Sequence, residues 1–187
     1  MRYSIFLLAF IGLTFLGCSV KYEHINLNSK NELIVTKQDI QIQKRIEELS
    51  LNIQHLSKSV SPKDANDIAY KTTYYAMHLA NDYALVAPAL FQNYLVNQKK
   101  KERGLCYHWV TDILKYLENS DYKTLGIYKV VANKGEYNEH NAISITAFYE
   151  TFDKGILLDA WRDSGKLFFI PIQEDSIYDW KLRKKIQ

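Results

Sequence analysis

The sequence predicts an α+β fold in which N-terminal helices pack on a C-terminal antiparallel sheet. Up to residue 117, apolar residues recur mostly three or four positions apart, the spacing that gives a helix one buried face. After residues 119–121 (Asn-Ser-Asp) the pattern changes to short runs rich in Ile, Val, Tyr and Phe, separated by turn residues, which is typical of strands. Helices that come first and strands that follow favour α+β over an alternating α/β order.

The individual elements follow from the same patterns. Ser61-Pro62 is a helix start signal, because a capping hydroxyl precedes a proline at the first helical position. Expected helices cover residues 37–56, 62–81, 88 to the lysine run at 99–101, and 105–117, with a short terminal helix over 175–185. Expected strands cover residues 126–132, 141–148, 155–160 and 166–172. The chain thus divides into residues 1–17, a polar tether at 18–36, an amphipathic helix at 37–60 and an α+β domain at 61–187.

Composition limits the classes of function. With 187 residues, 47% of them hydrophobic, and only 7 glycines and 3 prolines, the chain suits one domain with an ordinary core and no low-complexity linker. A formal net charge of +3 is too small to indicate a nucleic-acid partner. Basic residues gather at 99–103 and 181–185. We expect both clusters to be solvated helix ends, with anionic lipid headgroups or cell wall as the alternative partner.

The first 17 residues have the pattern of an export signal. Arg2 supplies a positive start, residues 5–16 are apolar, and Leu16-Gly17-Cys18 has the small residue of a cleavage site. The apolar run is shorter than the roughly 20 residues of a membrane span. The segment resembles a bacterial lipoprotein signal peptide. That resemblance implies that Cys18 is acylated, for example with palmitate, and anchors the chain in the cell envelope, on the periplasmic side of the outer membrane where a cell has two membranes.

Cys106 is then the one free thiol of the mature chain. It falls in the first turn of the helix expected over 105–117, on its apolar stripe. A helix N-terminus favours the thiolate, and its free backbone N–H groups can stabilise an oxyanion. Gly104 allows close backbone approach at this turn. The alternative is a buried cysteine that acts only as a small hydrophobic residue.

His140 is the histidine expected to act as the base. It begins a strand in which it shares one face with Ala142, which leaves room for a packed helix, while Asn141 and the isoleucines point to the other face. His108 lies two positions beyond Cys106 and points away from it on a helix. The other histidines lie in the tether or in helices: His24, His55 and His78. Because no Cys or His pair has metal-ligand spacing, we expect no metal, and chemistry on a thiol nucleophile needs no other cofactor.

Asp159 is the residue expected to orient the imidazole of His140 and stabilise its charged form. It ends an otherwise apolar strand, where a carboxylate is costly unless it is paired or hydrogen-bonded. It could also simply mark the strand end or pair with Arg162. If residues 151–154 form a simple hairpin loop, Asp163 would lie nearer to His140, but we favour Asp159.

These residues resemble the transglutaminase-like branch of the papain-like cysteine enzymes over about residues 100–172. The carriers are Gly104-Leu105-Cys106 opening a helix, His140 opening a strand, and Leu158-Asp159-Ala160-Trp161 closing the next. The resemblance implies a papain/transglutaminase-like core, with Cys106 as nucleophile, His140 as general base and acid, and Asp159 as the orienting residue. It implies thiol hydrolase or acyltransferase chemistry on an amide of a protein, a peptide or a cell-wall stem peptide, through a thioester.

Two features leave the function open. No clear glutamine precedes Cys106 as an oxyanion donor, with Gln92 and Gln98 the candidates, so this support can rest on the Cys106 backbone N–H. The rival hypothesis is a catalytically silent lipoprotein that uses the fold as a binding or scaffolding module. Trp109 and Trp161 are expected in the core rather than in a substrate cleft.

Overall fold

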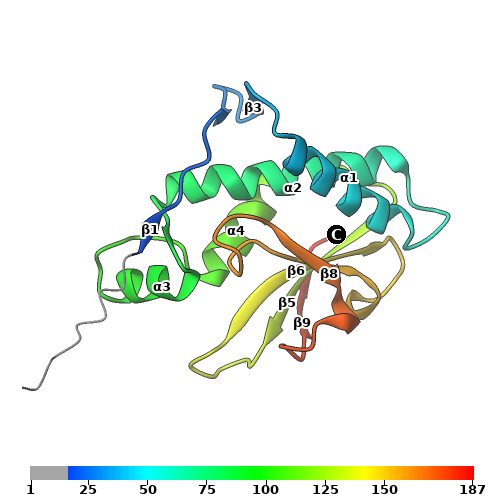
Figure 1. The fold of residues 1–187 in the computed structure, drawn as a ribbon. Coiled ribbons are helices and arrows are strands. Elements are labelled where there is room, and N and C mark those ends of the chain that lie inside the picture. Colours follow the sequence, from blue (N-terminus) through cyan, green and yellow to red (C-terminus); the bar gives the residue numbers. More distant parts are fainter. Residues whose placement is uncertain (1–16) are drawn as a thin grey trace, which may run out of the picture.

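The computed structural model describes residues 17–187, in which the helices come first and a five-stranded sheet follows (Figure 1). The helices are α1 (Ile40–Gln54), α2 (Pro62–Asp82), α3 (Ala89–Asn97) and α4 (Cys106–Leu117), with short 3-10 turns at Phe152–Lys154 and Ile172–Glu174. The large sheet contains β5 (Leu125–Ala132), β6 (His140–Ala147), β7 (Ile156–Asp159), β8 (Phe168–Pro171) and β9 (Lys181–Lys185). Its order is β8-β7-β6-β5-β9, and every neighbouring pair is antiparallel. The predicted α+β class and antiparallel sheet are confirmed.

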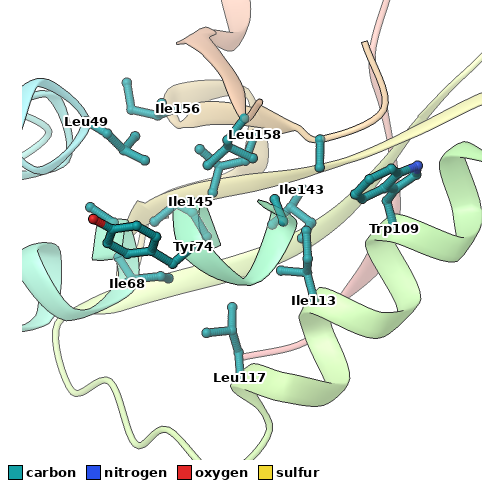
Figure 2. Packing of buried hydrophobic residues seen from close by; sticks show 14 of the residues in the cluster. Leu49, Ile68, Tyr74, Trp109, Ile113, Leu117, Ile143, Ile145, Ile156 and Leu158 are labelled. Carbon is teal, nitrogen blue, oxygen red and sulfur yellow. The ribbon is translucent and has the colours of Figure 1, made fainter. Parts of the chain in front are cut away.

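The main core lies between the helices and one face of the sheet. Figure 2 shows Leu49 of α1, Tyr74 of α2 and Trp109 of α4 around the isoleucines and leucines that β6 and β7 present on this face. The strand register puts Ile143 opposite Leu158 and Ile145 opposite Ile156, so four branched side chains form one apolar surface. Packing of α1, α2 and α4 on that surface fixes where the first residue of α4 lies relative to the ends of β6 and β7.

The C-terminal residues form a strand rather than the expected helix. β9 pairs with β5, with Val131 opposite Lys181 and Tyr128 opposite Lys185, and a register shift between Lys129 and Val130. Its sequence, Lys-Leu-Arg-Lys-Lys, has neither helical nor strand alternation, so the prediction had little local signal. Pairing satisfies the backbone groups along the β5 edge, and a lysine-rich outer strand opposes further edge pairing.

Residues 18–36, expected as a tether, pack against the domain instead. β1 (Cys18–Ser19) pairs with β4 (Val86–Ala87), and β2 (Ile25–Leu27) forms a hairpin with β3 (Leu33–Val35). Ile25 is buried, and the Asn81 side chain both accepts from the Tyr22 backbone N–H and donates to its carbonyl. Tyr22 lies outside a strand, so these two hydrogen bonds satisfy its backbone N–H and carbonyl groups in place of strand pairing.

The expected signal peptide falls almost wholly outside the described residues. Among residues 17–187, no helix has the length and apolar character needed to cross a membrane.

Truncation of Ile145 should strongly destabilise the fold. Its side chain is 0% exposed at the centre of the helix-facing surface of β6, so Ile145→Ala should lower the free energy of unfolding by about 2–5 kcal/mol through lost burial and a cavity. Urea unfolding measures this change. Ile177→Ala is the matched control, because Ile177 is 68% exposed, and a comparable loss there would contradict the core assignment.

Candidate active site

Cys106 is the first residue of α4 and lies against the start of β6. Trp109 and Ile113 of α4 pack in the main core, which holds the helix N-terminus over this strand end. The thiol side chain faces the β6 backbone: Sγ lies 3.7 Å from the Glu139 carbonyl oxygen and 3.9 Å from Nδ2 of Asn141. Cys106 is 9% exposed, so the sulfur is largely, although not completely, shielded from water.

The helix N-terminus at Cys106 is stabilised by an unexpected residue. Leu105 is the N-cap, and it has no polar side chain. Nδ1 of His108 instead accepts hydrogen bonds from the backbone N–H groups of Gly104 and Leu105, both at 3.2 Å. His108 therefore shapes the turn before the cysteine, while its ring does not serve the thiol. Burial lowers the pKa of His108, and the nearby Arg103 lowers it further, so the ring stays a neutral acceptor.

His140 and Asp159 meet in the interior, as the sequence predicts. Nε2 of His140 lies 2.7 Å from Oδ2 of Asp159, and both residues are buried. The register of β6 and β7 places Asp159 on the same sheet face as His140, because Ile143 and Leu158 are opposite each other on the other face. The exposed Asp163 is not the residue that contacts the ring.

The remaining ring nitrogen of His140 is the one available to the thiol. Nε2 contacts Asp159, so Nδ1 is left for Cys106, and the two residues line the same cleft. Burial raises the pKa of Cys106, but the hydrogen bond and positive charge of His140 outweigh burial and the pKa falls below its ordinary value. Burial also lowers the pKa of His140, yet Asp159 and Cys106 together raise it well above the ordinary value. Both shifts favour a thiolate–imidazolium pair.

Aromatic rings surround His140, and Tyr178 and Trp180 pack on its own sheet face. The ring centroids of Tyr178, Trp161 and Trp180 lie 4.7, 4.8 and 5.5 Å from the imidazole. The expectation of a helix over this face was wrong: α4 packs on the opposite face, and two of the three rings come from the C-terminal segment. The rings shield the imidazole from water, and this burial lowers its pKa, so the charged form depends on Asp159 and Cys106.

Asp159 has a full set of donors. Its Oδ1 accepts from the backbone N–H groups of Trp161 (3.0 Å) and Arg162 (3.1 Å), and its Oδ2 accepts from Nε of Arg162 at 3.1 Å besides the contact with His140. The guanidinium continues to Asp175 at 2.7 Å, and Asp175 also accepts from the Trp180 indole N–H. Asp159 therefore contacts both His140 and Arg162, although the sequence left Arg162 as an alternative partner.

A second network orients Asn141 toward the sulfur. Arg183 of β9 donates to Oδ1 of Asn141 at 2.7 Å and to Oε1 of Glu139 at 2.6 Å. Because Oδ1 is held by the guanidinium, the amide NH2 of Asn141 faces Cys106, where it favours the thiolate. Sequence reasoning placed Asn141 on the correct face but missed this role, since Arg183 was expected in a helix.

The two candidate glutamines differ in position. Gln92 is fully buried, and its amide is used structurally: the carbonyl accepts from the Val86 N–H and the NH2 donates to the Arg103 carbonyl. Gln98 lines the cleft. Sequence reasoning missed a third amide, Asn93, whose Oδ1 accepts the Trp161 indole N–H at 2.9 Å. An indole only donates, so the Asn93 NH2 group is left for another acceptor.

The cleft over Cys106 and His140 has a volume of about 620 Å³. Side-chain amides and aromatic rings dominate its walls; it is lined by Leu90, Asn93, Tyr94, Asn97, Gln98, Leu105, Tyr107, Tyr137, Asn138, Glu139, Trp161 and Tyr178. The one charged lining residue besides the site itself, Glu139, is neutralised by Arg183. Trp161 thus lines the cleft, contrary to expectation, whereas Trp109 is buried as predicted. In residues 17–187, no group of three or more His, Cys, Asp or Glu side chains is arranged to hold a metal ion.

Comparisons with known proteins give no relative from which a role could be carried over. No protein-family model, curated protein or solved structure matches the chain. The resemblance to transglutaminase-like enzymes therefore rests on the residues named above.

Proposed function

We propose that the protein is a lipid-anchored envelope thiol hydrolase or acyltransferase that acts on an amide or peptide bond, with a papain/transglutaminase-like core. The observation that carries the proposal is the convergence at one cleft of a cysteine at a helix N-terminus with a buried His140–Asp159 pair at 2.7 Å. A nucleophile, a base and an orienting carboxylate gathered at one cleft are the parts that nucleophilic acyl transfer needs.

The geometry supports a two-step reaction. The Cys106 thiolate attacks the carbonyl carbon of the amide, and the carbonyl electrons move to oxygen. The backbone N–H of Cys106 at the helix N-terminus stabilises this oxyanion, with the Asn93 NH2 as a side-chain candidate. The imidazolium of His140 then gives its Nδ1 proton to the leaving nitrogen, the C–N bond breaks, and a thioester remains on the sulfur.

The second step returns the enzyme to its starting state. His140, now neutral, takes a proton from water or from an acceptor amine as that nucleophile attacks the thioester carbonyl. The C–S bond breaks, the acid or the new amide leaves, and the thiolate–imidazolium pair is restored. Asp159 keeps the ring oriented throughout through its contact with Nε2.

The walls of the cleft favour an acyl donor with little charge. Tyrosine rings and the amides of Asn93, Asn97 and Asn138 can pack against and hydrogen-bond with a peptide chain, while no unpaired charge lines the cleft to select an ionic group. A binding module would use the same cleft. The burial of Cys106 favours this second candidate, because a binding module does not need its sulfur to be accessible to a substrate.

The reactivity of Cys106 should reveal the depressed thiol pKa. Alkylation by iodoacetamide needs the thiolate, so its rate should remain high well below the midpoint of about 8.5 of an ordinary cysteine. His140→Ala removes the hydrogen bond and the charge that lower the pKa most and should move the midpoint upward, because burial is then opposed only by the hydrogen bonds of Asn141. Rates are followed by mass spectrometry over a pH series, with circular dichroism as a check of folding. A wild-type midpoint at or above 8.5 would contradict the ion pair.

Substitutions in the three site residues should separate catalysis from binding. Cys106→Ser should abolish turnover, and His140→Ala should lower kcat/KM about 10²- to 10⁴-fold, because proton transfer is lost. Asp159→Asn should have a smaller effect, since the ring keeps its place and loses its charge partner. The assay follows incorporation of a fluorescent primary amine, and ammonia release, with a library of peptide amides. The exposed His55→Ala is the control. Equal turnover by wild type and Cys106→Ser would remove the enzyme hypothesis and leave the binding module.

Anchoring has its own test. If residues 1–17 are a lipoprotein signal peptide, the native protein should begin at Cys18 and carry two or three fatty acyl groups. Mass spectrometry of the N-terminal peptide from membrane-purified protein measures this directly. Cys18→Ser should abolish acylation, and an unprocessed wild-type chain that begins at Met1 would show that the anchor assignment is wrong.

A further inference from the structure

The proposed lipid attachment point lies beside α3. Cys18 is exposed in β1 and is paired with Ala87 in β4, directly before α3 begins. Ser19 continues the pairing with Val86, so the mature N-terminus would lie along this strand. Figure 1 shows β1 and α3 together at one end of the molecule. An acyl group on Cys18 would therefore enter a membrane next to this helix.

α3 exposes an apolar and an aromatic side chain at this end. Leu90 is 70% exposed and Tyr94 is 57% exposed, and their spacing of one turn puts them on the same side of the helix. The chain that leaves α3 carries two exposed lysines, Lys99 and Lys100. Lys101 is not counted with these two lysines, because its ammonium donates a hydrogen bond to the Ala84 carbonyl. We call Leu90, Tyr94, Lys99 and Lys100 the α3 face.

The chemistry of the α3 face matches a membrane surface. An aliphatic side chain reaches the acyl region, a tyrosine favours the headgroup level, and lysines are attracted to anionic headgroups. Two or three acyl groups on Cys18 would hold the chain at a membrane but would not fix which side of the domain faces the lipid, so a second contact of this kind has a physical purpose. We propose that the α3 face binds the surface of an anionic membrane alongside the acyl group on Cys18. This rests on the proposed anchor but not on catalysis.

The contact would also orient the cleft. Leu90 and Tyr94 line the cleft over Cys106, together with Asn97 and Gln98 of the same segment. A membrane on the α3 face therefore lies at the rim of the cleft. The acyl donors within reach of the sulfur are then amides presented at the membrane surface, on a membrane-attached peptide or protein.

Site-specific probes test the orientation in the protein purified from membranes. In a Cys106→Ser background, the variants Leu90→Cys and Tyr94→Cys are labelled with an environment-sensitive NBD fluorophore. Lys58→Cys, exposed in the α1–α2 connection at the far end of α2, is the matched control. The proteins are mixed with vesicles of phosphatidylethanolamine and phosphatidylglycerol in equal parts, with or without brominated acyl chains, and with vesicles of phosphatidylcholine.

Labels at 90 and 94 should shift to the blue and be quenched severalfold more than the label at 58 in the anionic vesicles. Lys99→Gln with Lys100→Gln should weaken this quenching, whereas Lys58→Gln with Lys63→Gln, which removes the same charge at the other end, should not. Equal quenching at 94 and 58 would overturn the proposal, as would a blue shift that depends on protein concentration and not on vesicles, which indicates self-association. Because serine replaces Cys106 in every variant, these outcomes are independent of whether the protein is an enzyme.

Discussion

The buried hydrogen bond between His140 and Asp159 is the interaction on which the site depends. A carboxylate withdrawn from water is stable only when donors replace its hydration. Asp159 has four: the imidazole, the Arg162 side chain and two backbone N–H groups. The requirement joins the end of β7 to the start of β6, and those two strand ends then define where a thiol at the N-terminus of α4 must lie.

The C-terminal segment completes what the central strands begin. Trp180 and Tyr178 enclose the imidazole, Asp175 holds the far side of Arg162, and Arg183 fixes the amide of Asn141. These contacts act on the imidazole itself, on the guanidinium that binds Asp159, and on the amide that faces the sulfur. The segment therefore contributes to the charge balance of the site without supplying any of the three proposed reacting groups. Its loss should change the pKa of the Cys106 thiol more than it changes the packing of the main core.

Local rules were enough to place the three candidate site residues at the ends of their elements, because each placement depends on one element alone. Cys106 follows from a helix start, His140 from strand alternation, and Asp159 from the cost of a carboxylate in an apolar run. The supporting residues could not be predicted in this way. Arg183 meets Asn141 only through the pairing of β9 with β5, and the sequence of β9 has no period that indicates a strand. The order in residues 18–36 likewise depends on distant partners such as Asn81.

α3 lies between the proposed lipid anchor at Cys18 and the residues beside His140. It follows β4, which pairs with the strand that begins at Cys18, and its Asn93 accepts the indole N–H of Trp161, whose ring lies 4.8 Å from His140. A single hydrogen bond thus joins the helix nearest the anchor to the ring beside the base. A shift of α3 would move the Asn93 amide and one wall of the cleft together, whereas His140 and Asp159 would stay fixed by Arg162 and the sheet. Membrane contact through α3 would therefore act on substrate binding and oxyanion support, and leave the thiolate–imidazolium pair unchanged.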